Sequence, residues 1–462
     1  MENGRWFMFD GIHNILRFTV FGHQWTKGNY LGKYLIVIFI ILFASITVNA
    51  QSVDSLVNEA VVNNPKLKSL EYKIKASEYR SESVNNLPPP NLSVEFSQVP
   101  INEYNILNQS ISNNLALSQM FPIGGKLNAM AEVENKNTLV EGDNFNTYKV
   151  NLIAQVKMSY YSLWLLDRKL EIQRNNIALL NDLLKAIQVS YYTNKINQAD
   201  ILTVQSEIAS NETQLLILEK QRESEIYKLN KLLGRDLNSK TIFVLEKFEA
   251  DSLKISQSQL EELLSDSNPS LKKMNSMIDM NKAMITANNK ELIPDLMVQG
   301  MLMRMPKGMT LTSASDLTML DPKTEVMYSL MFSINLPFAP WSSGKIKYKE
   351  EELAAGINSI EQEKNDMQRE MTAQLKEALV KYNTAKELTE LYDKKVIPLY
   401  TSSTESQTAA YQNGKTGITA VLDSYRMLLM QKMNYFMSKA DVQMSLAEVE
   451  MMVGANLKKY YR

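Results

Sequence analysis

The sequence predicts a mainly α-helical fold with a few membrane-spanning strands, built from two copies of one helix–strand–strand–helix unit. Two recurrences predict the duplication. The pair Asn64-Pro65 recurs as Asn268-Pro269 at an offset of 204 residues, and Tyr191 recurs as Tyr411 at an offset of 220. In both halves, segments that alternate between apolar and polar residues lie between proline breakers. A repeat of about 200 residues indicates that the two halves fold alike.

The repeat divides the chain into three parts. Residues 1–50 are predicted to be a signal peptide with an extended leader, residues 51–257 the first repeat with its linker, and residues 258–462 the second repeat. The apolar run from Tyr34 to Val48 supports the signal peptide, because it is short for a transmembrane helix and ends in small residues. A membrane anchor is the alternative for this run. No later apolar run reaches the length of about 18 residues that a spanning helix needs.

The composition excludes several classes of function. The chain has no cysteine, and its only two histidines, His13 and His23, lie in the predicted signal peptide. The mature chain would therefore lack the side chains of most nucleophilic triads and of nearly all zinc and iron sites. Its acids are spread over helix faces and do not converge in a cleft, so we expect no enzyme and no cofactor. The net charge of −1 gives no sign of nucleic-acid binding.

In the first repeat, apolar periodicity and proline or glycine breakers predict each element in order. The elements are a helix over Val53–Asn86, strands over Leu92–Val99 and Leu115–Phe121, a loop over residues 102–114 between them, and helices over Lys126–Asn194 and Gln198–Leu233. The last helix has near-heptad apolar spacing, which predicts coiled-coil packing. It ends at Gly234, a residue suited to a helix C-cap.

The second repeat has the same order. Its predicted elements are a helix from Leu260, strands over Leu296–Met305 and Glu325–Leu336, a helix from Lys345, and a turn over residues 413–417 before the last helix. All four strands are long enough to cross an outer membrane with tilt. Four strands cannot close a barrel, however, and an open sheet in lipid would leave unpaired edges. Several copies of the chain must therefore share one barrel.

The motifs, taken in order and twice over, resemble those of the TolC-like outer-membrane efflux family. They are Asn64-Pro65, Leu87-Pro88-Pro89-Pro90-Asn91-Leu92, Phe121-Pro122, Gly124-Gly125-Lys126, Leu336-Pro337, Ser343-Gly344-Lys345, and the paired turns before Leu202 and Leu422. The resemblance implies a homotrimer with an outer-membrane barrel of twelve strands in contact with lipid, and a long periplasmic tunnel of coiled-coil helices. It also implies a passive exit duct of a tripartite efflux system, which docks to an inner-membrane pump through a periplasmic adaptor.

The resemblance also assigns residues near the turns over residues 194–197 and 413–417, here called the tip turns. The family closes its tunnel there with polar contacts and an acidic ring. Asp423 matches this ring in the second repeat, Asp200 matches the tip aspartate of the first, and Tyr411 fits the same pattern. Ala420 stands where the family often has another acid, so we expect a thinner or displaced ring. For Asp200, the alternative is an ordinary acid that complements a helix N-terminus.

The tip turns also fit contact with an adaptor protein. Lys195 and Lys415 occupy corresponding positions in the two repeats, and Gly414 lies in the second turn. The alternative is that these residues only keep the turns soluble.

Most of the 26 methionines lie in the second repeat. Those in helices, such as Met427, Met430 and Met437, recur at helical spacing and are expected to pack in the core. Those in strands fall on the face that the first repeat makes polar, which is expected to line the barrel lumen. They are Met297, Met301, Met303, Met305, Met327 and Met331. Thioethers are soft ligands that suit Cu(I) and Ag(I), so these six predict transient contacts with heavy-metal cations; the alternative is apolar filler.

Three other functions stay open at this point. The duct could serve multidrug export or type I protein secretion instead of heavy-metal efflux. A secreted coiled-coil structural protein would explain the helices. It would not explain paired alternating strands between proline breakers.

Overall fold

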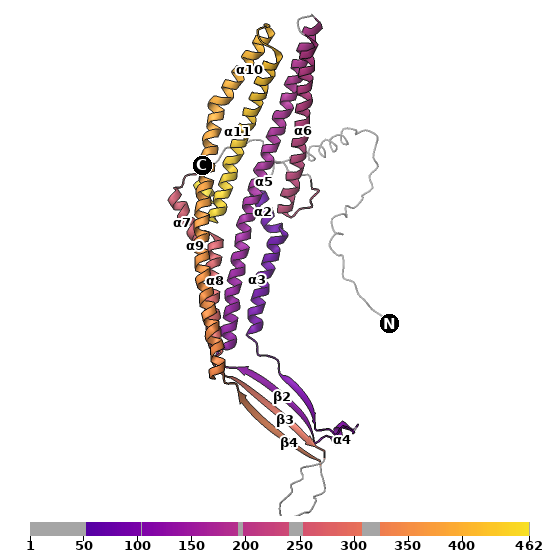
Figure 1. Cartoon of the computed structure of the whole chain (residues 1–462), viewed down its shortest axis with the longest axis vertical. Helices are drawn as coiled ribbons and strands as arrows, with labels where there is room; N and C mark the ends of the chain where they lie inside the picture. Colours follow the sequence, from indigo (N-terminus) through magenta and orange to yellow (C-terminus); the bar gives the residue numbers. More distant parts are fainter. Residues whose placement is uncertain (1–51, 103, 193–196, 240–252, 307–323, 462) are drawn as a thin grey trace, which may run out of the picture. The chain divides into compact units, whose positions relative to one another are not determined.

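The structure, a computed structural model, describes residues 52–102, 104–192, 197–239, 253–306 and 324–461. These residues are mainly helical and include one four-stranded sheet (Figure 1). The predicted signal peptide lies outside them. No helix in the described ranges has the length and apolar character needed to cross a membrane.

The two repeats have the same order of elements, as predicted, apart from a short helix inserted in the first and a π-helical turn that divides the long helix of the second. The first repeat consists of α2 (Val53–Asn63), α3 (Pro65–Val84), β1 (Asn91–Ser97), the inserted α4 (Ile106–Gln109), β2 (Ser112–Pro122), α5 (Lys126–Tyr192) and α6 (Gln198–Leu233). The second consists of α7 (Gln257–Ser267), α8 (Pro269–Lys290), β3 (Asp295–Met305), β4 (Glu325–Ile334), α9 (Pro340–Leu391), a π-helical turn (Tyr392–Val396), α10 (Ile397–Gln412) and α11 (Ile418–Val453).

The first predicted helix is in fact two helices, α2 and α3, which meet at Asn64. The Asn64 backbone is extended (φ −61°, ψ 120°), and its side-chain oxygen accepts from the amides of Lys66 and Leu67 at 3.0 and 3.1 Å. Pro65 has no amide to donate and takes the first helical position, which starts a new helix. The Asn64 side-chain amide also donates to Leu232 O at 2.9 Å, which ties the break to the end of α6.

The second repeat has the same Asn-Pro helix break, so the helix predicted from Leu260 is likewise divided into α7 and α8. Asn268 caps α8 by accepting from the amides of Ser270 and Leu271. Its side-chain amide donates to Met452 O at 2.7 Å, near the end of α11. The repeated Asn-Pro pair therefore joins the short helices of each repeat to the long helix that ends it.

Glycines at the ends of α6 and α11 pack against these breaks. Gly454 has φ +76°, and a Cβ added there would lie 2.7 Å from Pro269 Cδ and 2.9 Å from Asn268 Cα. Gly234 has φ +72°, and its Cβ would lie 2.6 Å from Asn63 O. Only glycine fits both the left-handed backbone and the close approach. The structure thus confirms the predicted C-cap at Gly234 and gives it a packing reason.

Long helices connect the sheet to the tip turns. α5 follows β2 directly and has 67 residues, which corresponds to roughly 100 Å. In the second repeat, α9 continues through the π-helical turn into α10, where Pro398 takes an early position without an amide to donate. α9 begins at Pro340 and not at Lys345 as predicted, because proline at the first helical position starts the helix.

Of the four buried apolar clusters in the described residues, three join more than two helices. The first joins α2, α3, α5 and α6 around Leu56, Leu163 and Leu229. The second joins α7, α8, α9 and α11 around Leu260 and Leu375. The third, here called the tip core, joins α5 and α6 to α11 through Leu180, Ile187, Val204, Ile208, Ile418, Val421 and Leu422. The two repeats therefore share one core near the tip turns.

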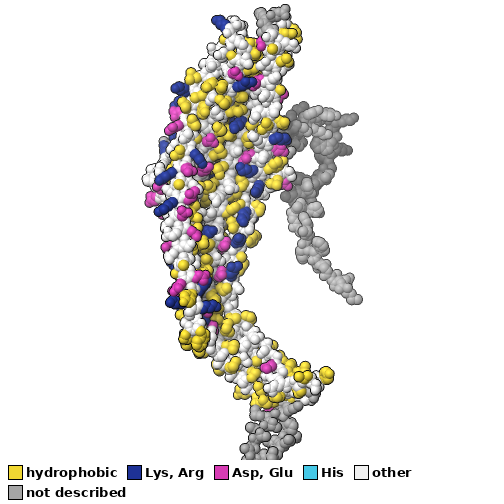
Figure 2. All heavy atoms as spheres, viewed as in Figure 1, with side chains coloured by type: hydrophobic (Ala, Val, Ile, Leu, Met, Phe, Trp, Pro, Cys, Tyr) yellow, Lys and Arg dark blue, Asp and Glu magenta, His cyan; other side chains and the backbone are white. Residues whose placement is uncertain are grey.

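The strands of both repeats form one antiparallel sheet in the order β1-β2-β3-β4, in which β2 pairs with β3. On β2, Leu115 and Leu117 are 45% and 55% exposed, whereas Ser112 and Asn114 on the opposite face are 5% and 8% exposed. Figure 2 shows apolar side chains over the strands, whereas charged side chains are scattered along the helices. On β2, an exposed apolar face opposite covered polar residues is the reverse of a soluble sheet and typical of strands in lipid.

All four strands differ from their predicted ranges by one to three residues at an end, and β1 ends at Ser97 and not at Val99. β2 begins at Ser112 instead of Leu115, because the ladder with β1 continues until Ser112 pairs with Ser97. The predicted loop over residues 102–114 is therefore shorter and contains α4. β4 ends at Ile334 and not at Leu336, since its ladder with β3 stops there.

Replacing Gly454 with alanine should destabilise the protein by about 2–4 kcal/mol, because the new methyl would meet Pro269 and Asn268 on a left-handed backbone. Gly414→Ala is the matched control. Gly414 has φ +70°, but no atom of the described residues lies within 4 Å of its Cβ position. Only the backbone cost of about 1–2 kcal/mol applies there. Chemical unfolding of both variants measures the difference, and equal losses would contradict the close approach.

Candidate functional site

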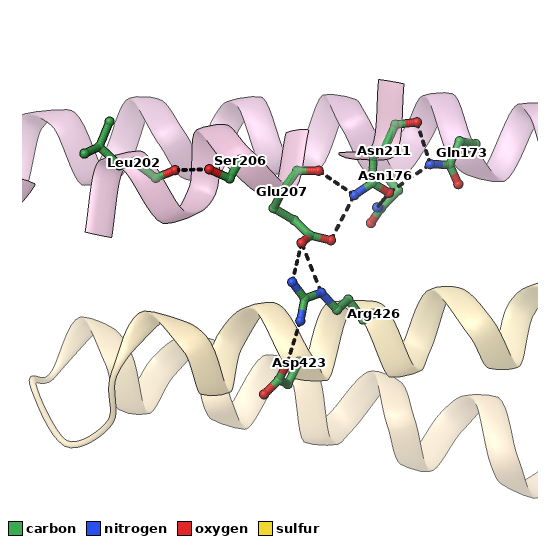
Figure 3. Close-up of polar contacts among 8 residues, drawn as sticks. All are labelled: Gln173, Asn176, Leu202, Ser206, Glu207, Asn211, Asp423 and Arg426. Carbon is green, nitrogen blue, oxygen red and sulfur yellow. Dashed lines mark hydrogen bonds and ion pairs between the residues drawn. The ribbon is translucent and has the colours of Figure 1, made fainter. Parts of the chain in front are cut away.

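A polar cluster near the tip turns joins the two repeats. Arg426 on α11 donates from Nε to Glu207 Oε2 on α6 at 3.0 Å, and its Nη2 donates to the same oxygen. Its Nη1 donates to Asp423 Oδ1, one turn back on α11, at 2.9 Å (Figure 3). One guanidinium therefore binds a carboxylate from each repeat.

Polar side chains of the first repeat hold Glu207 from the other side. Asn211 Nδ2, one turn along α6, donates to Glu207 Oε1 at 2.9 Å. Asn211 Oδ1 in turn accepts from the side-chain amides of Gln173 and Asn176 on α5 at 2.8 and 2.9 Å. A chain of polar contacts thus runs from α5 through α6 to α11 and orients the carboxylate toward Arg426 (Figure 3).

This geometry determines the charge state of the cluster. The hydrogen bond from Arg426 lowers the pKa of Glu207, and the bond from Asn211 lowers it further against the opposing effect of burial. The same bond to Glu207 raises the pKa of Arg426. Both groups are charged at neutral pH, so the contact is an ion pair whose acidic side chain is only 10% exposed.

Asp423, the predicted member of an acidic ring, is exposed on the subunit and bound to Arg426. The sequence analysis missed both Arg426 and Glu207. Arg426 follows Asp423 by three residues, a spacing at which opposite charges meet on a helix, so the sequence contained a signal for it. It contained none for Glu207, because only the packing of α6 against α11 brings that side chain to Arg426.

Asp200 and Tyr411, the other two predicted gate residues, lie close enough to interact electrostatically. Burial raises the pKa of Tyr411, and the charge of Asp200 raises it further. Tyr411 packs against the tip core, and its buried hydroxyl has no hydrogen-bond partner among the described residues. Asp200 lies in the first turn of α6, where its amide donates to the N-cap Asn197 at 3.2 Å. This position also fits the alternative of a helix-terminal acid.

The predicted adaptor contacts are only partly described. Lys195 lies outside the described residues. Lys415 is exposed, and its amide donates to Ala410 O at 2.9 Å. Gly414 has φ +70°, which favours glycine in the turn between α10 and α11. The adaptor contact itself stays a prediction.

The sheet places all six predicted methionines on one face. Residues directly opposite on antiparallel strands share a face, and Met303 lies opposite Met327. The other four lie opposite polar residues, namely Met297 opposite Ser333, Met301 opposite Ser329, Met305 opposite Glu325 and Met331 opposite Gln299. Met120 of β2 lies opposite Met297 and adds a seventh methionine, which the sequence analysis missed.

The α11 methionines form the predicted core stripe only in part, because Met433, Met444 and Met451 are half-buried and none is fully buried. Met427, Met430 and Met437 are exposed on the subunit. The buried side of the helix consists of other residues, such as Val421 and Ala440. Helical spacing indicated that the methionines share a face, but it could not indicate which face packs against other helices.

Comparison with known proteins finds similarity to one family over part of the chain and to solved structures over most of it. The model of the family described as "Outer membrane efflux protein" matches residues 56–235. Among solved structures, the outer-membrane channel OprN is 14% identical with a TM-score of 0.70, over 88% of this chain and 90% of that one. The CmeC outer membrane channel of Campylobacter jejuni is 14% identical with a TM-score of 0.68, over 88% and 86%. CusC is 17% identical with a TM-score of 0.66, over 88% and 93%.

No curated protein matches the chain by sequence. The family match lies in the first repeat, and the structural matches extend over both. Together they confirm the predicted resemblance and the predicted fold class. They also confirm the predicted location in the outer membrane.

The Glu207→Gln variant should lose part of the pH dependence of stability. Because the pKa of Glu207 is lowered in the folded protein, the ion pair adds stability above the ordinary glutamate value of 4.5. This contribution is lost as the pH falls through the lowered folded pKa. Wild type should therefore lose more unfolding free energy than the variant between pH about 7 and about 3.

Glu219→Gln is the matched control. Glu219 accepts from Arg174 at 2.9 Å, but both side chains are exposed, so this pair should contribute under about 1 kcal/mol. Chemical unfolding of the three proteins across the pH range provides the measurement. The same pH dependence in wild type and Glu207→Gln would show that the buried pair does not stabilise the fold.

Proposed function

We propose that this chain, a TolC-like outer-membrane efflux protein, forms the passive exit duct of a tripartite efflux system. The main support for this proposal is the distribution of apolar and polar residues on the two faces of the sheet. Apolar and polar residues occupy opposite faces of its strands, and on β2 the apolar face is exposed while polar residues of the other face are covered, with Leu117 and Asn114 as the clearest contrast. Such a sheet fits lipid on one side and an aqueous lumen on the other.

The edges of the sheet require further copies of the chain. Within the described part of the chain, β1 and β4 each have a neighbour on one side only, and unpaired backbone groups are costly in lipid. A homotrimer joins β4 of each copy to β1 of the next and closes a barrel of twelve strands. The helices then form a tunnel in the periplasm.

The duct has no energy source of its own and acts by transport, not by catalysis. An inner-membrane pump supplies the energy, and a periplasmic adaptor contacts the tip turns at Lys195, Gly414 and Lys415. The two lysines make the turns positively charged, which favours an acidic surface on the adaptor.

The polar cluster near the tip turns supports a gate at the periplasmic end. In a trimer, three copies of Asp423 form a ring of carboxylates that attracts cations. Arg426 offsets part of this charge, and Glu207 holds Arg426 in place. Asp200 and Tyr411 contribute a second contact between the repeats beside the ring.

The methionine face supports soft heavy-metal cations, Cu(I) or Ag(I), as substrates. Seven thioethers lie on the face assigned to the lumen, and Met303 opposite Met327 offers two sulfurs to one ion. Weak, repeated sites pass ions along without trapping them. Multidrug export and type I protein secretion are the alternative uses of the same duct.

In planar bilayers the purified trimer should conduct ions and be blocked by hexaamminecobalt(III) added on the periplasmic side. Asp423→Ala should weaken this block several-fold, because three carboxylates leave the ring. Arg426→Gln is the matched variant, and we expect it to have the opposite effect on the block. It removes the guanidinium beside Asp423, so the block should strengthen.

The two parts of the proposal fail in different ways. A chain that cross-links only as a monomer in native membranes, or that never conducts, would contradict the duct. A conducting trimer with the same block in both variants would place the constriction elsewhere, with Asp200 as the next candidate.

Replacing the strand methionines with leucine should reduce copper or silver tolerance of cells without loss of folding, because leucine keeps bulk and apolarity but removes sulfur. The six positions are Met297, Met301, Met303, Met305, Met327 and Met331. Export of organic compounds should persist. The control replaces Met427, Met430 and Met437 on α11 in the same way and should leave tolerance unchanged. Wild-type tolerance in the six-fold variant would identify the methionines as filler.

A further inference from the structure

The loop between β1 and β2 carries an apolar surface that the duct does not use. This α4 loop consists of residues 98–111. Its exposed apolar side chains are Ile101 and Tyr104, which are fully exposed, and Ile106, Leu107 and Ile111, which are roughly half exposed. The only charged residue of the loop is Glu103. A group of large apolar side chains on a surface loop indicates an interaction site.

Hydrogen bonds fix the α4 loop to the apolar side of the sheet. Asn113 of β2 lies opposite Arg304 of β3, and this pair is on the same face as Leu115 and its partner Leu302. Asn113 Nδ2 donates to Leu107 O at 2.7 Å, and Arg304 Nη1 donates to the same oxygen at 3.3 Å. The loop is therefore held by the face that the proposed function places in lipid.

The attachment lies at the end of the apolar band. On β3 the band extends from Leu296 to Leu302, about 20 Å along the strand, and Arg304 ends it. At the strand tilt of about 35–45° found in outer-membrane barrels, this length spans roughly 15 Å of an apolar band that is about 25 Å tall. The helices join the strands at the opposite end, at Pro122 and Asp295, so the α4 loop marks the boundary remote from the periplasm.

We propose that the α4 loop lies in the lipid interface of the outer leaflet and anchors the barrel rim there. Ile101 and Leu107 enter the apolar region, and Tyr104 takes the position where an aromatic ring with a polar end is favoured. The occupant of this surface is lipid, because the surface continues the apolar face of the strands. The inference rests on the proposed function, since it requires the sheet to span the membrane.

The absence of cysteine from the chain allows a direct test with single-cysteine variants. A nitroxide label is attached at Ile101→Cys or Leu107→Cys in trimers reconstituted in phosphatidylcholine vesicles. Collision with oxygen reports lipid, and collision with a nickel chelate reports water. Leu330→Cys on the apolar face of β4 is the control for lipid, and Asn413→Cys in a tip turn is the control for water.

Labels at Ile101 and Leu107 should meet oxygen more readily than the label at Asn413, though less than the label at Leu330 in the middle of the apolar band, and the nickel chelate several-fold less than the label at Asn413. Nickel access equal to that at Asn413, with Leu330 still in lipid, would overturn the anchor and leave the duct intact. Exclusion of both reagents would also overturn it, because protein would then cover the loop. Nickel access at Leu330 would instead overturn the spanning sheet and, with it, the proposed function.

The contact between Arg304 and the α4 loop can be tested separately. Arg304→Gln removes the guanidinium that binds Leu107 O and Asn108 Oδ1, the latter at 3.4 Å. The label at Leu107 should then become more mobile, while the label at Leu330 keeps its spectrum. An unchanged spectrum at Leu107 would overturn the role of Arg304 in holding the α4 loop.

Discussion

In lipid, every backbone amide and carbonyl must find a partner within the protein, and this constraint shapes the whole chain. One repeat supplies only two strands, so β2 of the first repeat pairs with β3 of the second. Two edges, β1 and β4, still remain among the described strands, and in the proposed trimer they pair between copies of the chain. Duplication within the chain and the proposed assembly between chains therefore meet the same requirement at two levels.

The repeated helix breaks make the same contacts in the two halves. Asn64 binds the end of α6 and Asn268 binds the end of α11, and the glycine that ends each long helix packs against the break. The short helices of each repeat are thereby fixed to the helix that returns from the tip turn. Similar contacts in both halves suit a tunnel in which two repeats of each of three chains take nearly equivalent places.

The sequence was sufficient to predict features that follow from a regular spacing of apolar residues along the chain. Alternation along the strands predicted both faces of the sheet, and the ladder confirms that Met303 and Met327 share one. Single helix-breaking residues were harder to predict. Asn64 looks like part of one continuous helix, and only the structure shows that its side chain caps the next helix. The pair of Arg426 and Glu207 could not be predicted, since it depends on how α6 and α11 pack, and helical spacing does not specify the partner of a face.

The position of Glu207 makes separation of the repeats near the tip turns depend on acid. If α6 and α11 part, Arg426 leaves and a nearly covered carboxylate loses its cation, which is costly while Glu207 stays ionised. Asn211 compensates only part of this loss, because it binds the other carboxylate oxygen. A protonated Glu207 needs no cation, so acid weakens the bond that holds the proposed gate. The tip core is apolar and does not respond to acid, which limits the effect to the polar contact.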